Sequence, residues 1–433
     1  MPNQTSSVPR LCLASFLLAF CAAQLWFAFA LPAGWDEAVY AGMANYLASL
    51  GQAGFWEPGR PPGLPLLLVP GVALGAAPLV IARVLGIVAS VSLILLCYVL
   101  AGRGWPGLAA AVLIGLNNSF FSQAWTGFTD ILSTALAVGS LLLVRRAPFA
   151  AGALAGLAGL TRFVQGLALI PAALALRSRP RKIAMMGAGA ATIGLPWLAA
   201  NKILLGSPAA PLFEAAKAIG PEFGWLYAQG PAFYLFVLGP LAAMLALAAL
   251  TLISRPLSRL EPALWTATLL FLAFFSFLPH KEARYVLVAL PYVVVLGVIG
   301  LYWAVQRLPR PLALAAWVLV FATAALPFSL PEPVSAFPQL PELDGTVMSS
   351  DPRAGLQLDN RLVPYYYGFT DALGNYEPRL HASSAIIHRP ASFPCRPSDL
   401  DCARQKAALA ELALSQAELI MAEEGVYVFS VAR

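Results

Sequence analysis

The residues best suited to chemistry gather in one short run, from Pro279 to Tyr285, with the sequence PHKEARY. It holds a histidine, two cations and an acid between two long apolar stretches, from Leu264 to Leu278 and from Val286 to Leu301. A charged side chain at the centre of a bilayer costs at least about 2.5–3.5 kcal/mol, so this cluster belongs at an interface or in a polar cavity. A loop that simply marks the membrane edge is the alternative, but it would need neither mixed charges nor a histidine.

Other strongly polar side chains fall in loops or near the ends of apolar stretches, on the same predicted side of the membrane. Together with the run above they make the following set: Asp36, Glu37, Arg60, Asp130, Arg162, His280, Lys281, Glu282 and Arg284. Cations can bind and neutralise a phosphate, and a carboxylate can take a proton from an acceptor. The set therefore suits a lipid-linked phosphate substrate, provided that the fold brings its members together.

The composition predicts a polytopic membrane protein. Of the 433 residues, 59% are hydrophobic and 11% are charged, with a mean hydropathy of +0.74. An ordinary soluble domain carries about 25% charged residues. The net charge of +6 is therefore interpreted as a marker of topology, and no nucleic-acid partner is expected. Five cysteines are too few for a disulfide framework.

The apolar runs predict an all-α transmembrane domain, residues 1–329, with about eleven membrane-spanning helices. Leu11 to Ala30 is long enough to cross a roughly 30 Å hydrocarbon core. We interpret it as an uncleaved anchor because Arg10 is the one cation before it. The short runs on either side of Arg162 are expected to be broken or tilted helices. With the N-terminus inside, the predicted cytoplasmic loops are all basic, and they hold Arg103, Arg145–Arg146, Arg177–Lys182, Arg255 with Arg259, and Arg307 with Arg310.

The first outer segment, Pro32 to Pro62, contains a further helical pattern. Tyr40, Met43, Tyr46 and Leu47 recur at helical spacing, which predicts an amphipathic helix lying on the membrane surface. The two prolines at 61 and 62 suit a kinked entry into a second interfacial helix, from Gly63 to about Gly75.

Hydropathy falls after Leu330, and residues 330–433 are expected to form a small extracytoplasmic α/β domain. Its predicted strands are Gly345–Ser350, Val363–Tyr367 and Val426–Val431, and its predicted helix runs from about Ala403 to Leu419. Cys395 and Cys402 could form a disulfide in an oxidising compartment or stay free. His381 and His388 are interpreted as surface residues, and no metal site is expected.

Several of the polar residues have simpler interpretations. Asp36 could be the N-cap of a helix from Ala38 to Leu50, with Glu37 in its first turn, and Asp130 could also be a cap. Arg162 is either a phosphate or sugar ligand or the partner of a buried acid. Arg60 could anchor to lipid headgroups.

The order of these parts resembles the GT-C superfamily of integral-membrane glycosyltransferases, which use polyprenyl-phosphate sugars. Gly34-Trp35-Asp36-Glu37 looks like the acidic motif of that superfamily, in which the Asp is the catalytic base. Arg60-Pro61-Pro62-Gly63-Leu64-Pro65 is similar to the proline-rich segment that follows it, and Thr129-Asp130 resembles a second acidic position.

The run from His280 to Tyr285 resembles the HKExRF signature of dolichyl-phosphate-mannose-dependent mannosyltransferases, with Tyr285 in place of Phe. The whole resemblance covers about residues 10 to 325. The residues after 330 carry no motif that we recognise.

The resemblance implies an inverting displacement at the extracytoplasmic face, without a covalent intermediate, a metal or another cofactor. Asp36 would accept the proton of the acceptor hydroxyl, with Glu37 orienting a partner. Lys281, Arg284 and His280 would stabilise the departing phosphate. The remaining members of the set, Arg60, Asp130, Arg162 and Glu282, would bind substrate.

The predicted donor is a polyprenyl-phosphate hexose, with mannose favoured, and the acceptor is a lipid, a glycan or a protein. An aminoarabinose- or protein-directed transferase of the same superfamily is the nearest alternative. A transporter or flippase of lipid-linked glycans could use the same charges, but it would often show an internal repeat, and we find none. A non-catalytic assembly factor would leave Asp36 and the HKEAR run unexplained.

Overall fold

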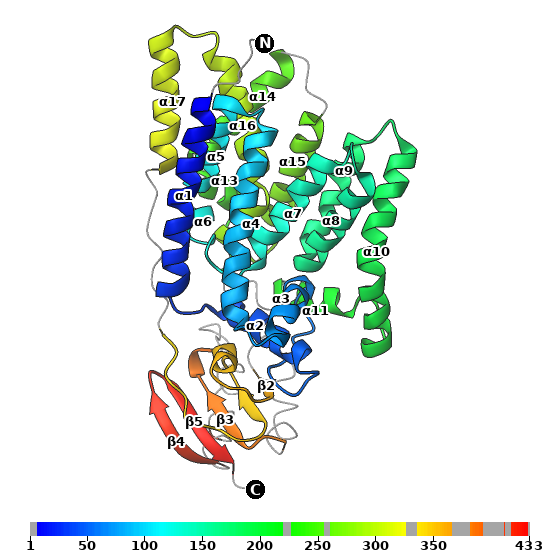
Figure 1. Ribbon diagram of the computed structural model, residues 1–433, viewed down its shortest axis with the longest axis vertical. Helices are drawn as coiled ribbons and strands as arrows, with labels where there is room; N and C mark the ends of the chain where they lie inside the picture. The colour runs from blue at the N-terminus through cyan, green and yellow to red at the C-terminus, as the bar shows by residue number, and fades with distance from the viewer. Residues whose placement is uncertain are drawn as a thin grey trace. The chain divides into compact units, whose positions relative to one another are not determined.

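The computed structural model describes residues 7–219, 227–254, 260–325, 336–365, 382–392, 411 and 417–431. These residues are mostly helical, with one small sheet near the C-terminus (Figure 1). They divide into two compact units. The helical unit comprises Met1–Ala28, Gly59–Gly63 and Arg83–Pro331, and the mixed unit comprises Phe29–Pro58, Leu64–Ala82 and Glu332–Arg433.

In its described residues, the helical unit is built from α-helices joined by short connections and by 3-10 segments. Its helices, in whole or for the most part, are α1 (Ser7–Ala30), α4 (Pro78–Leu100), α5 (Gly104–Gly115), α6 (Asn118–Phe121), α7 (Thr129–Leu143), α8 (Pro148–Thr161), α9 (Leu169–Ala175), α10 (Pro180–Leu205), α11 (Ala210–Ile219), α13 (Phe233–Leu238), α14 (Pro240–Ser254), α15 (Glu261–Phe277), α16 (Leu290–Val305) and α17 (Arg310–Ala325). The 3-10 segments are η1 (Phe163–Ala168) and η3 (Ala283–Val288).

The chain is an integral membrane protein by composition and by its helices. Among the described residues, α1, α4 and α10 are long and apolar enough to cross a bilayer. Other apolar helices, such as α7 and α16, have 10–17 residues. The expected count of about eleven spans therefore stays a prediction, whereas the expected interruption at Arg162 is confirmed, because α8 ends at Thr161 and η1 follows.

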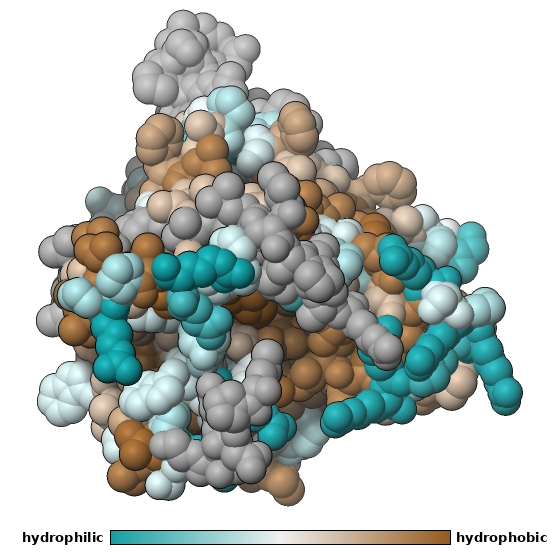
Figure 2. Space-filling model, turned by 90° about the horizontal axis from the view of Figure 1, so that it is seen from above, coloured by the Kyte–Doolittle hydropathy of each residue, from teal (hydrophilic) through white to brown (hydrophobic). Residues whose placement is uncertain are grey.

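The connections that carry basic residues gather at one end of the helical unit. Figure 1 shows the α9–α10 and α16–α17 connections at the same end, and these hold Arg177–Lys182 and Arg307 with Arg310. Looking down on that end, Figure 2 shows separate groups of hydrophilic side chains around a hydrophobic surface. Loops of this kind are retained in the cytoplasm, so this arrangement favours the predicted orientation.

Helices α8 and α10 pack at close range because each supplies a glycine at the contact. A Cβ on Gly152 would collide with the carbonyl oxygen of Met186, and a Cβ on Gly189 would collide with that of Phe149. Small residues at such positions allow the backbones of membrane helices to approach closely.

In the mixed unit, α2 (Trp35–Ala48) packs against the 3-10 helix η4 (Pro352–Leu356). The predicted helix is confirmed, and Tyr40 and Met43 are buried against other parts of the protein. The ring of Phe55 packs against Gly42, where a larger side chain would collide with it. The expected position of the helix on a membrane surface stays a prediction. The predicted second helix is present as α3 (Gly63–Ala73).

The sheet of the mixed unit has the strand order β2-β1-β3-β5-β4. The strands are β1 (Val347–Ser349), β2 (Leu362–Pro364), β3 (Ala385–His388), β4 (Ala417–Glu423) and β5 (Val426–Val431). β1 runs parallel to β2 and β3, whereas β5 runs antiparallel to β3 and β4. The segment after α2 joins this sheet, because Gly54 N donates to Asn360 O (3.0 Å) and Leu362 N donates to Gly54 O (2.8 Å).

Strands β1 and β5 confirm two of the predicted segments in position. Of the third, Val363 and Pro364 lie in β2, whereas Tyr366 and Tyr367 lie outside the described residues. The predicted helix is wrong at its end, because Ala417–Leu419 belongs to β4, and most of its earlier part lies outside the described residues. Cys395, Cys402 and His381 also lie outside them. His388 is buried in β3 and is not a surface residue.

The glycine contact predicts a sharp difference between two substitutions. Gly152→Leu should separate α8 from α10 and lower the thermal stability of the detergent-solubilised protein, because a well-packed contact cannot absorb the added volume. Gly187→Leu, also in α10, is the matched control, since nothing lies within 4 Å of a Cβ there. Equal melting temperatures for the two variants would contradict this packing.

Candidate functional site

A cluster of charged and aromatic side chains in the helical unit comes from three separate stretches of the chain. They are the start of α7, the α8–η1 junction, and the residues from Leu278 through η3. The HKEAR run forms the third stretch. It leaves α15 in an extended conformation at Leu278 and enters η3 at Ala283.

The first contact in the cluster is a buried ion pair. Arg162 Nη1 lies 2.8 Å from Asp130 Oδ1, and the two side chains are 16% and 2% exposed. Asp130 is not the N-cap of α7, because that position is Phe128. The alternative that Arg162 is the partner of a buried acid is therefore confirmed.

The backbone around Asp130 is braced by polar side chains. Thr134 Oγ1 donates to the carbonyl oxygen of Asp130 (2.7 Å) and accepts from Gln165 Nε2 (2.8 Å). Because Gln165 lies in η1, just after Arg162, the two contacts hold η1 against the first turn of α7.

Glu282 is the centre of the second group of contacts. Its Oε1 accepts from Arg284 Nη2 (3.1 Å) and lies 2.7 Å from His280 Nε2, while its Oε2 lies 2.8 Å from Arg284 Nε. Two contacts between one guanidinium and one carboxylate fix the plane of the guanidinium as well as its position. Glu282 therefore orients the histidine and the arginine of the HKEAR run.

Tyr285 links the two groups. Its hydroxyl donates to Glu282 Oε1 (2.9 Å), and the guanidinium carbon of Arg162 lies 4.9 Å from the centre of its ring. Burial raises the pKa of the Tyr285 phenol, and the negative charge of Glu282 raises it further. The hydroxyl therefore stays protonated and remains a donor.

The two other members of the run are buried in different ways. The ring of His280 packs at a tilt against that of Tyr227, with ring centres 4.3 Å apart, and Lys281 N donates to the carbonyl oxygen of Tyr227 (3.1 Å). Lys281 Nζ donates to the carbonyl oxygen of Leu278 (2.6 Å), which is neutral. The ammonium of Lys281 is thus held in place by a dipole and not, in these contacts, by a carboxylate.

Arg60 also belongs to the helical unit, where it is half-buried. The segment that carries it lies against the end of α8, because a Cβ on Gly63 would be 2.6 Å from the backbone nitrogen of Thr161. Thr161 directly precedes Arg162. Arg60 and Arg162 are therefore carried by two backbone segments in close contact.

Asp36 and Glu37 belong to the mixed unit and open α2. The N-cap of α2 is Gly34, so the interpretation of Asp36 as the cap is wrong. Glu37 is buried, and its Oε2 accepts from Gly34 N (2.9 Å). It satisfies a backbone donor of the first turn. Asp36 is half-buried one residue before it.

Three further residues of the cluster could not be assigned roles from sequence alone: Tyr285, Tyr227 and Gln165. Tyr285 carried a signal, because it is the position at which the run departs from its motif, whereas Tyr227 and Gln165 sit in ordinary apolar surroundings. Within the described ranges, no group of three or more His, Cys, Asp or Glu side chains could hold a metal ion.

Comparison in sequence finds a family match over the part of the chain that holds the HKEAR run. Residues 224–332 match the Alg9-like mannosyltransferase family. No curated protein matches the chain in sequence.

Comparison of the fold extends the likeness to the whole chain. ArnT from Cupriavidus metallidurans bound to undecaprenyl phosphate has 15% identity and a TM-score of 0.64, over 96% of this chain and 98% of that one. The apo state of ArnT gives a TM-score of 0.62. The arabinofuranosyltransferase AftD from Mycobacteria gives 0.52, with 15% identity, over 97% of this chain and 42% of that one.

Together these comparisons confirm the resemblance to the GT-C superfamily of glycosyltransferases. The fold is that of ArnT, with a mostly helical part and a small C-terminal sheet.

The Asp130–Arg162 pair predicts a strong coupling between two substitutions. Asp130→Asn or Arg162→Gln alone leaves the other charge buried, which costs about 3–5 kcal/mol. The double variant should lose clearly less than the sum of the two losses in thermal or denaturant unfolding in detergent. As a control, Asp130→Asn combined with Arg103→Gln, at an exposed residue, should be additive. Additive losses for Asp130 and Arg162 would contradict the ion pair.

Proposed function

We propose that this protein is an inverting glycosyltransferase that takes a hexose from a polyprenyl-phosphate donor. The observation that carries the proposal is the buried cationic cluster around Glu282, which lies within the residues that match the Alg9-like mannosyltransferase family. That family match favours mannose as the sugar. The likeness to ArnT, a protein solved with undecaprenyl phosphate bound, supports a polyprenyl-phosphate carrier.

In the proposed reaction, Asp36 takes the proton of the acceptor hydroxyl as its oxygen bonds to C1 of the sugar. The bond between C1 and the lipid phosphate breaks at the same time, and the phosphate leaves with its negative charge. Negative charge in the first turn of a helix is favoured by the helix dipole, and Asp36 lies in the first turn of α2. Glu37, which bonds to Gly34 N, fixes the first turn of α2 and so positions Asp36.

Cations near the departing phosphate would stabilise charge that develops in the transition state. In the described contacts, Arg284 and His280 are oriented by Glu282, and Arg162 is paired with Asp130. Lys281 is held by a neutral carbonyl, so its charge is the least offset of these. We assign Lys281 and Arg284 the leaving phosphate, with His280 beside them.

Arg60, Asp130, Arg162 and Glu282 are assigned to binding and positioning in this proposal. Glu282 acts through His280 and Arg284, and Asp130 acts through Arg162. The reaction would take place on the extracytoplasmic side, because the basic connections gather at the other end of the helical unit. The acceptor is a lipid, a glycan or a protein.

The base is tested by sugar transfer in membranes supplied with radiolabelled polyprenyl-phosphate-mannose. Asp36→Asn should abolish transfer, by at least about 100-fold, because a positioned base contributes roughly 10²–10⁴-fold. Asp359→Asn, at an exposed acid of the same unit, is the matched control and should leave the rate unchanged. If Asp36→Asn transfers the sugar at the native rate, Asp36 is not the base.

The donor class and the transport alternative are tested with the same membranes. If no polyprenyl-phosphate sugar in a panel is used by the native protein, the transferase proposal fails. Movement of an intact lipid-linked glycan across proteoliposomes would then support a flippase.

The phosphate assignment predicts a graded response at Lys281. Lys281→Gln should lower kcat and kcat/KM together by about 10–100-fold, because the charge matters most when the phosphate leaves. Lys281→Arg should recover part of the rate, since it keeps the charge. An increase in KM with unchanged kcat would instead assign Lys281 to ground-state binding of the donor.

A further inference from the structure

The mixed unit contains a cavity of its own, separate from the residues assigned to sugar transfer. Its volume is about 350 Å³, and its walls include Ala336, Phe337, Pro338, Arg353, Arg389 and Glu424. All of these residues belong to the C-terminal part of the mixed unit. Pockets that bind small molecules have volumes of about 300–1,000 Å³, so this one suits a ligand of one or two rings.

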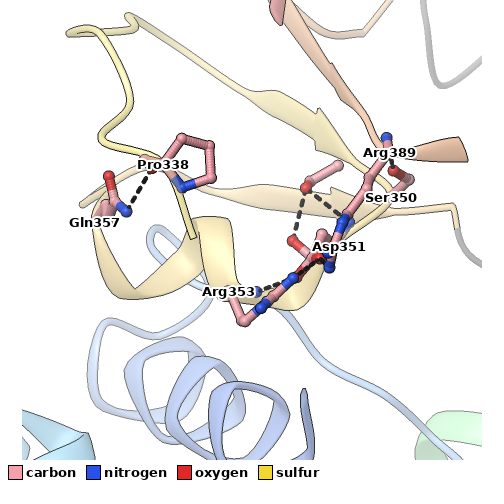
Figure 3. A network of polar contacts seen from close by, with 7 residues as sticks. Pro338, Ser350, Asp351, Arg353, Gln357 and Arg389 are labelled. Atoms are coloured by element: carbon pink, nitrogen blue, oxygen red, sulfur yellow. Dashed lines mark hydrogen bonds and ion pairs between the residues drawn. The ribbon is translucent and has the colours of Figure 1, made fainter. Parts of the chain in front are cut away.

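Two arginines of the cavity wall are fixed by one buried acid, Asp351, as Figure 3 shows. Asp351 Oδ2 accepts from Arg353 Nη2 (2.7 Å) and from Arg389 Nη1 (2.9 Å). Its Oδ1 accepts from the backbone nitrogen and from Nε of Arg353, both at 3.0 Å. The Asp351 side chain is fully buried, and the side chain of Arg389 is 23% exposed.

Asp351 is in contact with two guanidinium groups, so the two arginines carry one positive charge more than the acid that holds them. Glu424, in another part of the lining, offsets that charge for the cavity as a whole. Burial raises the pKa of Asp351, and the contacts with Arg353 oppose that shift. Protonation of Asp351 would remove its negative charge and leave both guanidinium charges in place. A single arginine would be enough to neutralise Asp351.

Another part of the wall is apolar and is also fixed. The guanidinium carbon of Arg353 lies 5.1 Å from the centre of the Phe337 ring. Gln357 clamps the segment that follows, because its Nε2 donates to Pro338 O (2.9 Å) and its Oε1 accepts from Leu340 N (2.8 Å) (Figure 3). The cavity is thus preformed on two sides.

Glu424 completes the lining with an exposed carboxylate at the turn between β4 and β5. A carboxylate there accepts hydrogen bonds from hydroxyl groups, whereas a guanidinium binds phosphate or carboxylate oxygens with well-defined geometry. Apolar side chains such as Phe337 and Pro338 suit the C–H face of a sugar ring.

We propose that this cavity binds an anionic sugar, one ring bearing a phosphate or carboxylate group. The anionic group lies against Arg389 and Arg353, the ring lies along Phe337 and Pro338, and a hydroxyl group donates to Glu424. The C-terminal part of the mixed unit is then a carbohydrate-binding module. This inference goes beyond the proposed transfer reaction and does not depend on it.

The test is a ligand titration of the intact protein in detergent, followed by saturation-transfer NMR and calorimetry. The probes are glucose 1-phosphate and glucuronate, with glucose and inorganic phosphate as comparisons. At least one of the two anionic sugars should bind at least about tenfold more tightly than glucose and than inorganic phosphate. Equal binding of glucose would overturn the role of the anion, and equal binding of inorganic phosphate would overturn the role of the sugar.

Variants assign the binding to this cavity. Arg389→Gln should weaken binding of the anionic sugar about tenfold or more, while Arg361→Gln, an exposed arginine of the same unit, should not change it. Arg284→Gln, in the helical unit, tests whether the ligand binds instead at the site assigned to sugar transfer. Binding lost in Arg284→Gln but kept in Arg389→Gln would place the ligand elsewhere and overturn the proposal.

A second pair of variants adds charge without removing a structural contact. Ala336 lines the cavity and is exposed, so a longer side chain there can be accommodated. Ala336→Glu should bind the anionic sugar several-fold more weakly than Ala336→Gln, which has the same size and no charge. Equal affinities would overturn the proposal, even if Arg389→Gln fails to fold.

Discussion

The cluster in the helical unit depends on the pairing of buried charges within an apolar set of helices. An ion without a partner in such surroundings would be strongly unfavourable, so each charged side chain of the cluster has to find a partner or a dipole. Asp130 pairs with Arg162, and Glu282 contacts Arg284 and His280. Lys281 donates a hydrogen bond to a backbone carbonyl. These residues come from three separate stretches of the chain, so the contacts that pair their charges also hold the three stretches together.

The same demand explains why the helices are interrupted where they are. A long uninterrupted helix has no unpaired backbone groups in its middle to receive a side-chain cation. At Leu278 the helix has ended, and its carbonyl oxygen accepts from Lys281 Nζ. At Arg162 the backbone turns extended between α8 and η1, which directs the guanidinium to Asp130. The α-helical conformation is therefore interrupted where charges are placed inside the unit, and the 3-10 segments η1 and η3 follow the two interruptions.

The sequence could predict features that depend on local contrast. The HKEAR run stands out because its charges interrupt apolar residues, and β5 stands out because its residues, VYVFSV, favour strands. β4 could not be found in this way, since Ala417–Glu423 has the composition of a helix and becomes a strand by pairing with β5. The β-bridge between Gly54 and Arg361 could not be predicted either, because no local sequence pattern indicates a contact between residues so far apart in the chain. The partner of Arg162 was predictable in kind, as a buried acid, but its identity required the fold.

Two acids in this chain are each in contact with more than one basic side chain. Glu282 is in contact with Arg284 and His280 and also accepts from Tyr285, and Asp351 accepts from Arg353 and Arg389. An acid whose task was stability would gain little from a second cation, because adding like charges around it introduces repulsion between them. The same geometry becomes useful when a bound ligand supplies a further negative charge. In the helical unit that ligand would be the phosphate that leaves the donor, and in the mixed unit it would be the anionic group of a sugar. On this view, Glu282 and Asp351 hold cations in place for a charge that arrives from outside the protein.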